Sequence, residues 1–212
     1  MRMRLRLRLL AGLALALCAI TATADQPLRP PQIAPFGDGD WWVLIDPIPT
    51  RIGVSTEIIT VPKGFVTDLA SIPRIFWSAF PKTGPYMSAA MLHDYLYWDQ
   101  RCSRAEADRI FDIEMKSYGV NDTSRKLIFA AVSEFGAQAW EANAARKKAG
   151  EPRFMPEDLL TQYLSQPFDA SRSWQAIRAQ IGQQAAPIKV SGDPNDDLAG
   201  ACSRALAANA SK

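Results

Sequence analysis

The chain has 212 residues, of which 48% are hydrophobic, and it carries 24 Lys and Arg against 22 Asp and Glu, with a single histidine. This length and apolar content allow one domain with extensions and exclude global disorder. A formal net charge of +2 provides no basic surface for nucleic acid, and one imidazole excludes a zinc site built on two or more histidines.

Residues 1–24 have the pattern of a secretory signal peptide. Four arginines precede an apolar run from Leu9 to Ile20, and an A-x-A cleavage signal follows at residues 22–24. The apolar run is shorter than the roughly 20 residues that cross a bilayer, so we expect cleavage after Ala24, no remaining transmembrane anchor, and a periplasmic or secreted protein. The mature chain then has 20 basic against 22 acidic residues, a net charge of about −2.

Changes of composition divide the mature chain. Residues 25–39 contain four prolines and little periodicity, which predicts an extended leader over the surface. Residues 40–150 hold the clear strand and helix patterns and form the predicted domain. Beyond them, residues 151–184 predict two short amphipathic helices as an appendage. Residues 185–212 are a low-complexity tail of Ala, Ser, Gly, Asp and Pro in which we find no core pattern.

The first part of the domain is predicted to form strands. Residues 41–46 (WWVLID) and 53–62 (GVSTEIITVP) are β-favouring runs on either side of a turn-rich segment. We expect the two runs to pair as a small antiparallel hairpin or meander between Trp41 and Val61. Phe65-Val66 is expected to add a short strand.

Three helices are predicted to follow. Residues 86–98 are apolar nearly all round, which is typical of a buried helix. A capping box at residues 103–106 starts a second helix that runs to about residue 118. Asn121 or Asp122 then caps a third helix, which ends at residue 150. The predicted fold class is α+β, with a small antiparallel sheet packed on about three helices and a helical C-terminal appendage.

Two groups of polar residues stand in apolar surroundings. They occur in GFVTDLASIPR (residues 64–74) and in LHDYLY (residues 92–97), and ADRIF follows on the next predicted helix. The candidate site residues that these segments supply are Thr67, Asp68, Ser71, Arg74, His93, Asp94, Tyr97 and Asp108. Burying polar or charged side chains without partners costs free energy, so we expect these residues to bond one another or a ligand.

His93 is the candidate general base. Adjacent residues of a helix point about 100° apart, so His93 and Asp94 do not bond each other, and a carboxylate must come from elsewhere. Asp68 and Asp108 are the two candidates. A histidine held by a carboxylate on one nitrogen can take a proton on the other, from water or from Ser71, as in a hydrolase. Thr67, Arg74, Asp94 and Tyr97 are the expected binding residues.

Two alternatives remain open for the same residues. In the first, Asp68, Asp94 and Asp108 converge on one divalent cation, which would polarise a water. His93 would then be its single nitrogen ligand. In the second, the network is purely structural: Asp68 caps a short helix, Arg74 pairs with Asp94 or Asp108, and His93 bonds a backbone carbonyl.

The motifs also resemble a known family. VPKGFVTDLASIPR, HDYLY and ADRIF, in this order, are similar to an uncharacterised bacterial and phage domain recognised by GF-x-TD-x-ASIPR and HD-x-LY segments. The resemblance covers about residues 41–132. It implies that the polar residues of both motifs are shared by the family, and it implies no settled activity.

The mature chain keeps two cysteines, Cys102 and Cys202, and we expect them to form a disulfide because an exported chain meets an oxidising compartment.

Two functions follow as hypotheses. The first is an exported hydrolase of cell-envelope material, peptidoglycan or lipid, that uses the His/Asp cluster with or without a divalent cation. The second is a non-enzymatic envelope or phage-derived interaction module whose polar network is structural. The expected partner is an envelope substrate or an envelope protein, and no nucleic acid.

Overall fold

The computed structural model describes residues 30–69, 86–182 and 193–211. Within them, five short strands form two small antiparallel sheets, and six helices pack around these sheets. The α+β class predicted from the sequence is confirmed. Residues 1–24, and with them the predicted signal peptide, lie outside the described residues, as do Ser71 and Arg74.

The first sheet has three strands in the order β1-β2-β5. β1 (Ile33–Pro35) and β5 (Val66–Thr67) flank the central β2 (Trp42–Leu44), and both pair with it antiparallel. β1 comes from the segment that we expected to be a surface leader, so that expectation is wrong for residues 33–36, where Phe36 is fully buried. Pro35 is tolerated because an edge strand does not need every backbone N–H for the sheet.

The second sheet is a ribbon of β3 (Ile48–Arg51) and β4 (Ile58–Val61), in which Ile48 lies opposite Val61. The predicted hairpin is therefore wrong in its pairing. β2 and β4 belong to different sheets, and the segment expected to be a turn supplies β3. In a two-stranded ribbon both strands are edges, so Pro49 fits in β3 although it has no N–H to donate.

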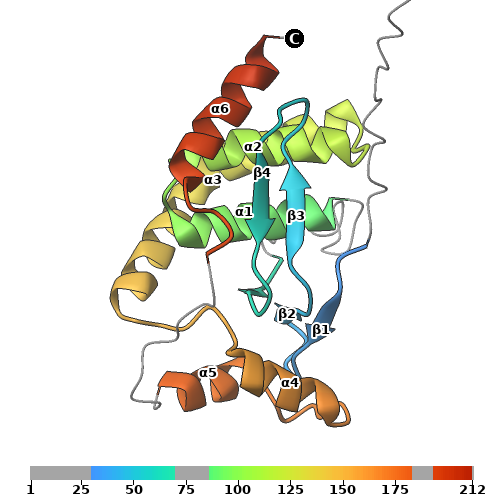
Figure 1. Ribbon diagram of the computed structural model, residues 1–212, viewed down its shortest axis with the longest axis vertical. Coiled ribbons are helices and arrows are strands. Elements are labelled where there is room, and N and C mark those ends of the chain that lie inside the picture. Colours follow the sequence, from blue (N-terminus) through green and yellow to red (C-terminus); the bar gives the residue numbers. More distant parts are fainter. Residues whose placement is uncertain (1–29, 70–85, 183–192, 212) are drawn as a thin grey trace, which may run out of the picture.

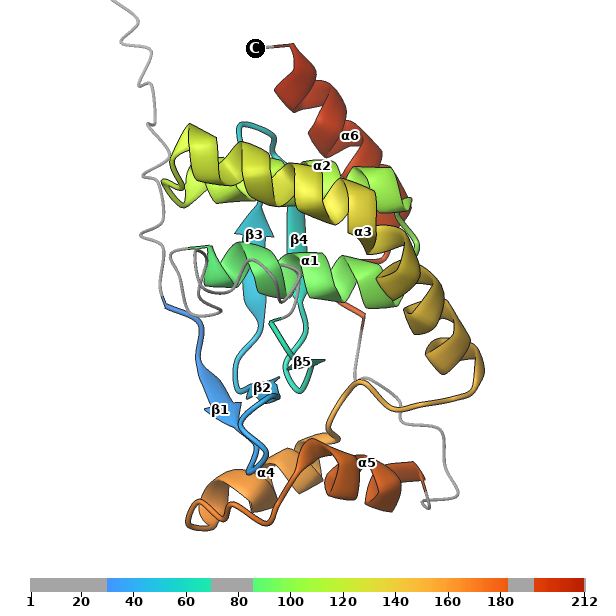
Figure 2. The ribbon, with the colours of Figure 1, turned by 180° about the vertical axis from the view of Figure 1, so that it is seen from behind.

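Three helices form the layer behind the ribbon (Figures 1 and 2). α1 (Met87–Asp99) is buried along nearly its whole length. α2 (Arg104–Ser117) starts with the predicted capping box, in which the Ser103 hydroxyl accepts from the Glu106 N–H. α3 (Asp122–Lys148) is capped by Asn121, one of the two predicted caps, and in Figure 2 its second half descends past the C-terminal end of α1. The three predicted helices are confirmed.

The appendage packs on the other end of the molecule. α4 (Glu157–Ser165) and α5 (Trp174–Gly182) lie beside the first sheet in Figure 1. They build a second hydrophobic cluster with the strands, in which the rings of Phe36 and Trp174 lie 5.3 Å apart. The segment leading into α4 pairs with β5, because the Val66 N–H donates to the Arg153 carbonyl at 2.9 Å.

The C-terminal tail contains a helix that we did not predict, α6 (Leu198–Ala210). Our finding of no core pattern is wrong for this stretch. Its buried residues repeat at helical spacing and are mostly small: Leu198, Ala201, Cys202 and Ala205. Small side chains carry a weak hydrophobic signal in a sequence, yet they let a helix approach its neighbours closely, and here α6 joins the main core on α2 and β4.

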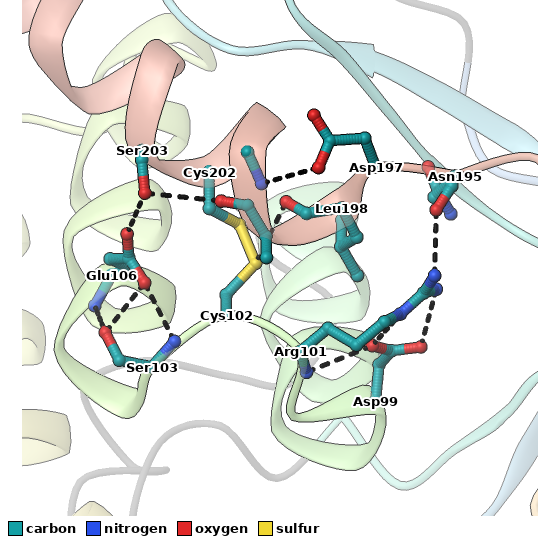
Figure 3. Close-up of a disulfide and its surroundings, with 12 residues drawn as sticks. Asp99, Arg101, Cys102, Ser103, Glu106, Asn195, Asp197, Leu198, Cys202 and Ser203 are labelled. Atoms are coloured by element: carbon teal, nitrogen blue, oxygen red, sulfur yellow. Dashed lines mark hydrogen bonds and ion pairs between the residues drawn. A yellow bond between two sulfur atoms is a disulfide. The ribbon is translucent and has the colours of Figure 1, made fainter.

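The predicted disulfide is confirmed. Cys102, just before α2, is bonded to Cys202 in α6, and their Cα atoms lie 6.1 Å apart (Figure 3). Around it, the Ser203 hydroxyl donates to Glu106 at 2.8 Å, and Arg101 donates to the Asn195 carbonyl at 2.8 Å. The bond closes a loop of 100 residues and ties the tail to the domain. No helix among the described residues has the length and hydropathy of a membrane span.

Candidate functional site

A cavity of about 450 Å³ lies where the predicted motifs meet α3. His93, Asp94 and Tyr97 of α1 line it together with Asp68, which follows β5. Its remaining wall comes from the second half of α3 and from Arg153. The tertiary structure thus brings residues of both motifs to one cavity.

His93 is buried in this wall and bonded to one of its two candidate carboxylates. Its Nε2 lies 3.0 Å from Oδ1 of Asp108, and both residues are almost inaccessible to solvent. The imidazole also stacks on the Phe111 ring at 4.6 Å. Because a carboxylate only accepts, this contact assigns the hydrogen to Nε2. The other nitrogen, Nδ1, is buried and has no hydrogen-bond partner among the residues that the structure describes.

Asp108 is held by two further donors. The Tyr97 hydroxyl donates to Oδ1 at 2.6 Å, and Arg104 donates to Oδ2 at 3.1 Å. Arg104 also donates to the Ser133 carbonyl at 3.0 Å, so the network joins α1, α2 and α3. Burial and the Asp108 carboxylate raise the pKa of the Tyr97 hydroxyl, which keeps its proton available for donation.

Gly136 of α3 makes room for this arrangement. A Cβ atom at this position would collide with the Tyr97 hydroxyl oxygen. The absence of a side chain therefore allows α3 to pass directly over the ring that holds Asp108 in place.

The first motif is attached to α1 through Thr67 and Asp94. The Thr67 hydroxyl donates to Oδ2 of Asp94 and accepts from the Leu69 N–H at 3.0 Å. Leu69 has a φ of 51°, in the left-handed region that side-chain-bearing residues seldom adopt. These contacts fix the backbone of residues 67–69 and place Asp68 at the cavity.

Asp68 does not bond His93. Its carboxylate faces the guanidinium of Arg153, with 3.6 Å between Oδ1 and Nη2. Sequence reasoning left Asp68 and Asp108 open as partners of His93, and the structure selects Asp108. It also missed Arg153 and Gly136. The signal for Arg153 was a single cation in the short apolar segment before α4.

The carboxylates do not form the three-ligand cluster of the metal alternative. Within the part of the chain that the structure describes, no group of three or more His, Cys, Asp or Glu side chains is arranged to hold a metal ion. Both oxygens of Asp108 already accept hydrogen bonds, and Asp94 accepts from Thr67. The contacts of Asp108 fit both the general-base and the structural alternatives.

Comparison with known proteins agrees with the motifs. Residues 42–132 match a family described as "Protein of unknown function (DUF1353)". A stretch of 78 residues is 35% identical to an uncharacterized protein, y4jT, from Sinorhizobium fredii (strain NBRC 101917 / NGR234), and it covers 36% of this chain and 23% of that relative. The chain thus matches about a quarter of the relative's length. No solved structure matches. The resemblance noted in the motifs is confirmed: the segment 42–132 is similar to this domain family of unknown function.

Proposed function

We propose that the cavity is the active site of a hydrolase in which His93 is the general base and Asp108 orients it. The observation that carries the proposal is the state of the imidazole, which lines the cavity: Nε2 is bonded to a buried carboxylate, and Nδ1 has no hydrogen-bond partner within the described part of the chain. This is the arrangement by which a carboxylate fixes the tautomer of a catalytic histidine.

The chemistry would proceed on an ester or amide carbonyl. Nδ1 accepts a proton from water as the water oxygen attacks the carbonyl carbon, and Asp108 stabilises the resulting imidazolium. The proton on Nδ1 then passes to the leaving group as its bond to carbon breaks. Tyr97 and Arg104 keep Asp108 in place throughout, because both donate to its carboxylate.

The cost of the arrangement supports a functional role. A buried acceptor without a partner costs about 1–3 kcal/mol, and most buried polar atoms in folded proteins are paired. Arg104 and Tyr97 would link the three helices through Asp108 without any contribution from Nδ1. A purely structural histidine would gain stability if this nitrogen were paired as well.

One observation favours the alternative of a structural network in an interaction module. Asp108 accepts bonds from two side chains of α1 and from Arg104, which also donates to α3, so the network cross-links three helices as a stabilising network does. The two candidates differ in what they require of His93. A hydrolase requires its basicity, whereas a structural network requires only its shape and its hydrogen bond to Asp108.

Cell-envelope material, peptidoglycan or lipid, is the proposed substrate, and export the proposed fate of the chain. The signal-peptide pattern of residues 1–24 supports export, and the Cys102–Cys202 bond is compatible with an oxidising compartment.

The test measures hydrolysis by the mature chain, residues 25–212, on peptidoglycan and on phospholipid vesicles. We expect His93→Gln to abolish turnover with a melting temperature within a few degrees of wild type, and Asp108→Asn to abolish turnover as well. Glu114→Gln is the matched control, because Glu114 is a second buried carboxylate of α2 that does not line the cavity.

A further variant separates basicity from structure. His93→Gly should lose turnover and regain part of it when imidazole is added, since the free base can occupy the vacated space. Full turnover by His93→Gln would refute the general base. Absence of hydrolysis by the wild type, together with large destabilisation of His93→Gln, would support the structural alternative.

A further inference from the structure

Arg153 is a buried cation with an unusual shortage of partners. Only 7% of its surface is exposed, and its backbone is held in place where Val66 donates to its carbonyl at 2.9 Å. The next residues fix this position further, because the Met155 N–H donates to Gly64 at 2.8 Å and a Cβ on Gly64 would collide with the Met155 carbonyl. The side chain is therefore positioned by a rigid pairing between β5 and the segment before α4.

The surroundings of the guanidinium are mostly aromatic. Its central carbon lies 4.7 Å from the centre of the Trp41 ring and 5.8 Å from those of Phe65 and Trp98. Oδ1 of Asp68 lies 3.6 Å from Nη2 of Arg153, which is too far for a hydrogen bond. A guanidinium that lies over a ring can still donate from the edge of its planar fork, which carries five N–H donors.

No hydrogen bond from this guanidinium occurs within residues 30–69, 86–182 and 193–211, and its Nε is buried without a partner. Burial also lowers the pKa of Arg153, which indicates a charge that the protein compensates incompletely. A buried guanidinium with an unsatisfied N–H and only a long contact to a carboxylate is expensive unless something else accepts from it. Since Arg153 lines the same cavity as His93, a ligand in that cavity can be the acceptor.

We propose that Arg153 binds a singly charged oxyanion group of the cavity's ligand, a carboxylate or a phosphodiester. This inference rests on the proposed function, because it takes the ligand of the cavity to be the substrate of the proposed hydrolase. The planar fork of arginine matches two oxygens of such a group with parallel hydrogen bonds. Asp68 and Asp94 line the same cavity, so a doubly charged group would meet about twice the repulsion that a singly charged one meets.

The remaining lining suits this assignment. Arg146 adds a second cation from α3, and Gln138 and Asn143 bring amide groups to the same wall. The cavity volume of about 450 Å³ lies in the range of small-molecule sites. An anionic end bound at Arg153 would thus leave the rest of a substrate within the cavity that His93 also lines.

The test measures binding rather than turnover, by NMR titration of the mature chain carrying His93→Gln. The probes are N-acetyl-alanyl-alanine, its C-terminal amide, and dimethyl phosphate, and the indole signals of Trp41 and Trp98 report on the site. We expect one of the two anions to bind, and the probe that binds identifies the source of the charge. For a carboxylate ligand, the amide should bind about tenfold to a hundredfold more weakly.

Arg153→Lys tests the fork directly. It keeps the charge but loses the paired donors, so we expect binding of the anion to weaken about tenfold or more. Arg178→Lys is the matched control. Arg178 lies on α5, pairs with Glu151 at 2.8 Å and does not line the cavity, so this variant should bind the anion as the parent protein does. If Arg153→Lys does not fold, the comparison of acid with amide decides the question without it.

The outcomes separate this inference from the proposed function. Three outcomes would overturn the role of Arg153. The first is equal binding of acid and amide with no binding of dimethyl phosphate, and the second is binding of neither anion. The third is undiminished binding by Arg153→Lys. Anion binding by a protein whose wild type hydrolyses nothing would uphold the anion site and overturn the hydrolase. Turnover that depends on His93, but is equal for charged and neutral substrates, would uphold the hydrolase and overturn the anion site.

Discussion

The burial of Glu114 leads us to predict an unusual dependence of the free energy of unfolding on pH. This α2 carboxylate is almost completely buried, and the Gly53 N–H donates to it at 3.0 Å. Burial raises its pKa from 4.5 to about 7, against the smaller opposing effect of that hydrogen bond. Gly53, at the turn between β3 and β4, has a φ of 53° and also lies against Asn209 of α6.

The sign and the size of the effect follow from this shift. The folded protein binds the Glu114 proton more tightly than the unfolded chain does, so between pH 4.5 and pH 7 folding retains a proton that unfolding releases. The free energy of unfolding therefore falls as the pH rises through this window. A difference of 2.5 units between the two pKa values corresponds to about 3 kcal/mol at pH values above both.

The assay is urea denaturation of wild type and Glu114→Gln from pH 4 to pH 8. The glutamine keeps an acceptor for Gly53 but has no charge, so we expect the variant to gain stability relative to wild type by up to about 3 kcal/mol as the pH rises. The exposed Glu141→Gln serves as the control, with no such trend. A difference between wild type and Glu114→Gln that does not change with pH would refute the reasoning.

Three further predictions follow from single contacts. Gly136→Ala should push the Tyr97 ring away from Asp108 and lower turnover without loss of the fold, as measured by hydrolysis rate and circular dichroism. Replacing both Cys102 and Cys202 by serine should lower the free energy of unfolding by about 4–5 kcal/mol, the chain-entropy value for a loop of 100 residues, in chemical denaturation. Thr67→Val removes a donor from buried Asp94 and should cost about 1–3 kcal/mol in the same assay; an unchanged midpoint would show that this bond adds nothing.

Local patterns predicted the helices well because their causes lie within a few residues. The capping box at Ser103 and Glu106, the cap at Asn121 and the apolar residues of α1 are all properties of neighbouring positions. The strands were harder. Their runs were visible, yet the pairing of β2 with β1 and β5, rather than with the second run, depends on contacts between distant segments.

The candidate site shows the same division. The sequence placed His93 and Asp94 on a buried helix and required a carboxylate for the histidine, because burial of an unpaired polar group is costly. The spacing of residues could not show whether Asp68 or Asp108 supplies this carboxylate, because neither lies on the same helix as His93. The packing of α2 against α1 brings Asp108 to Nε2, and the pairing of β5 with the segment before α4 brings Asp68 to Arg153.

What the sequence by itself determined is the α+β class, the three helices and their caps, the pair of motifs shared with a domain family, and the expectation of a disulfide between Cys102 and Cys202. Each of these depends on residue type and short-range spacing. Only the tertiary structure decided that α6 belongs to the core, which carboxylate holds His93, and that Arg153 reaches the cavity beside it. These features arise where elements far apart in the chain pack together. Which of these elements pack together depends on the free energy of the whole folded molecule, and short-range patterns do not contain it.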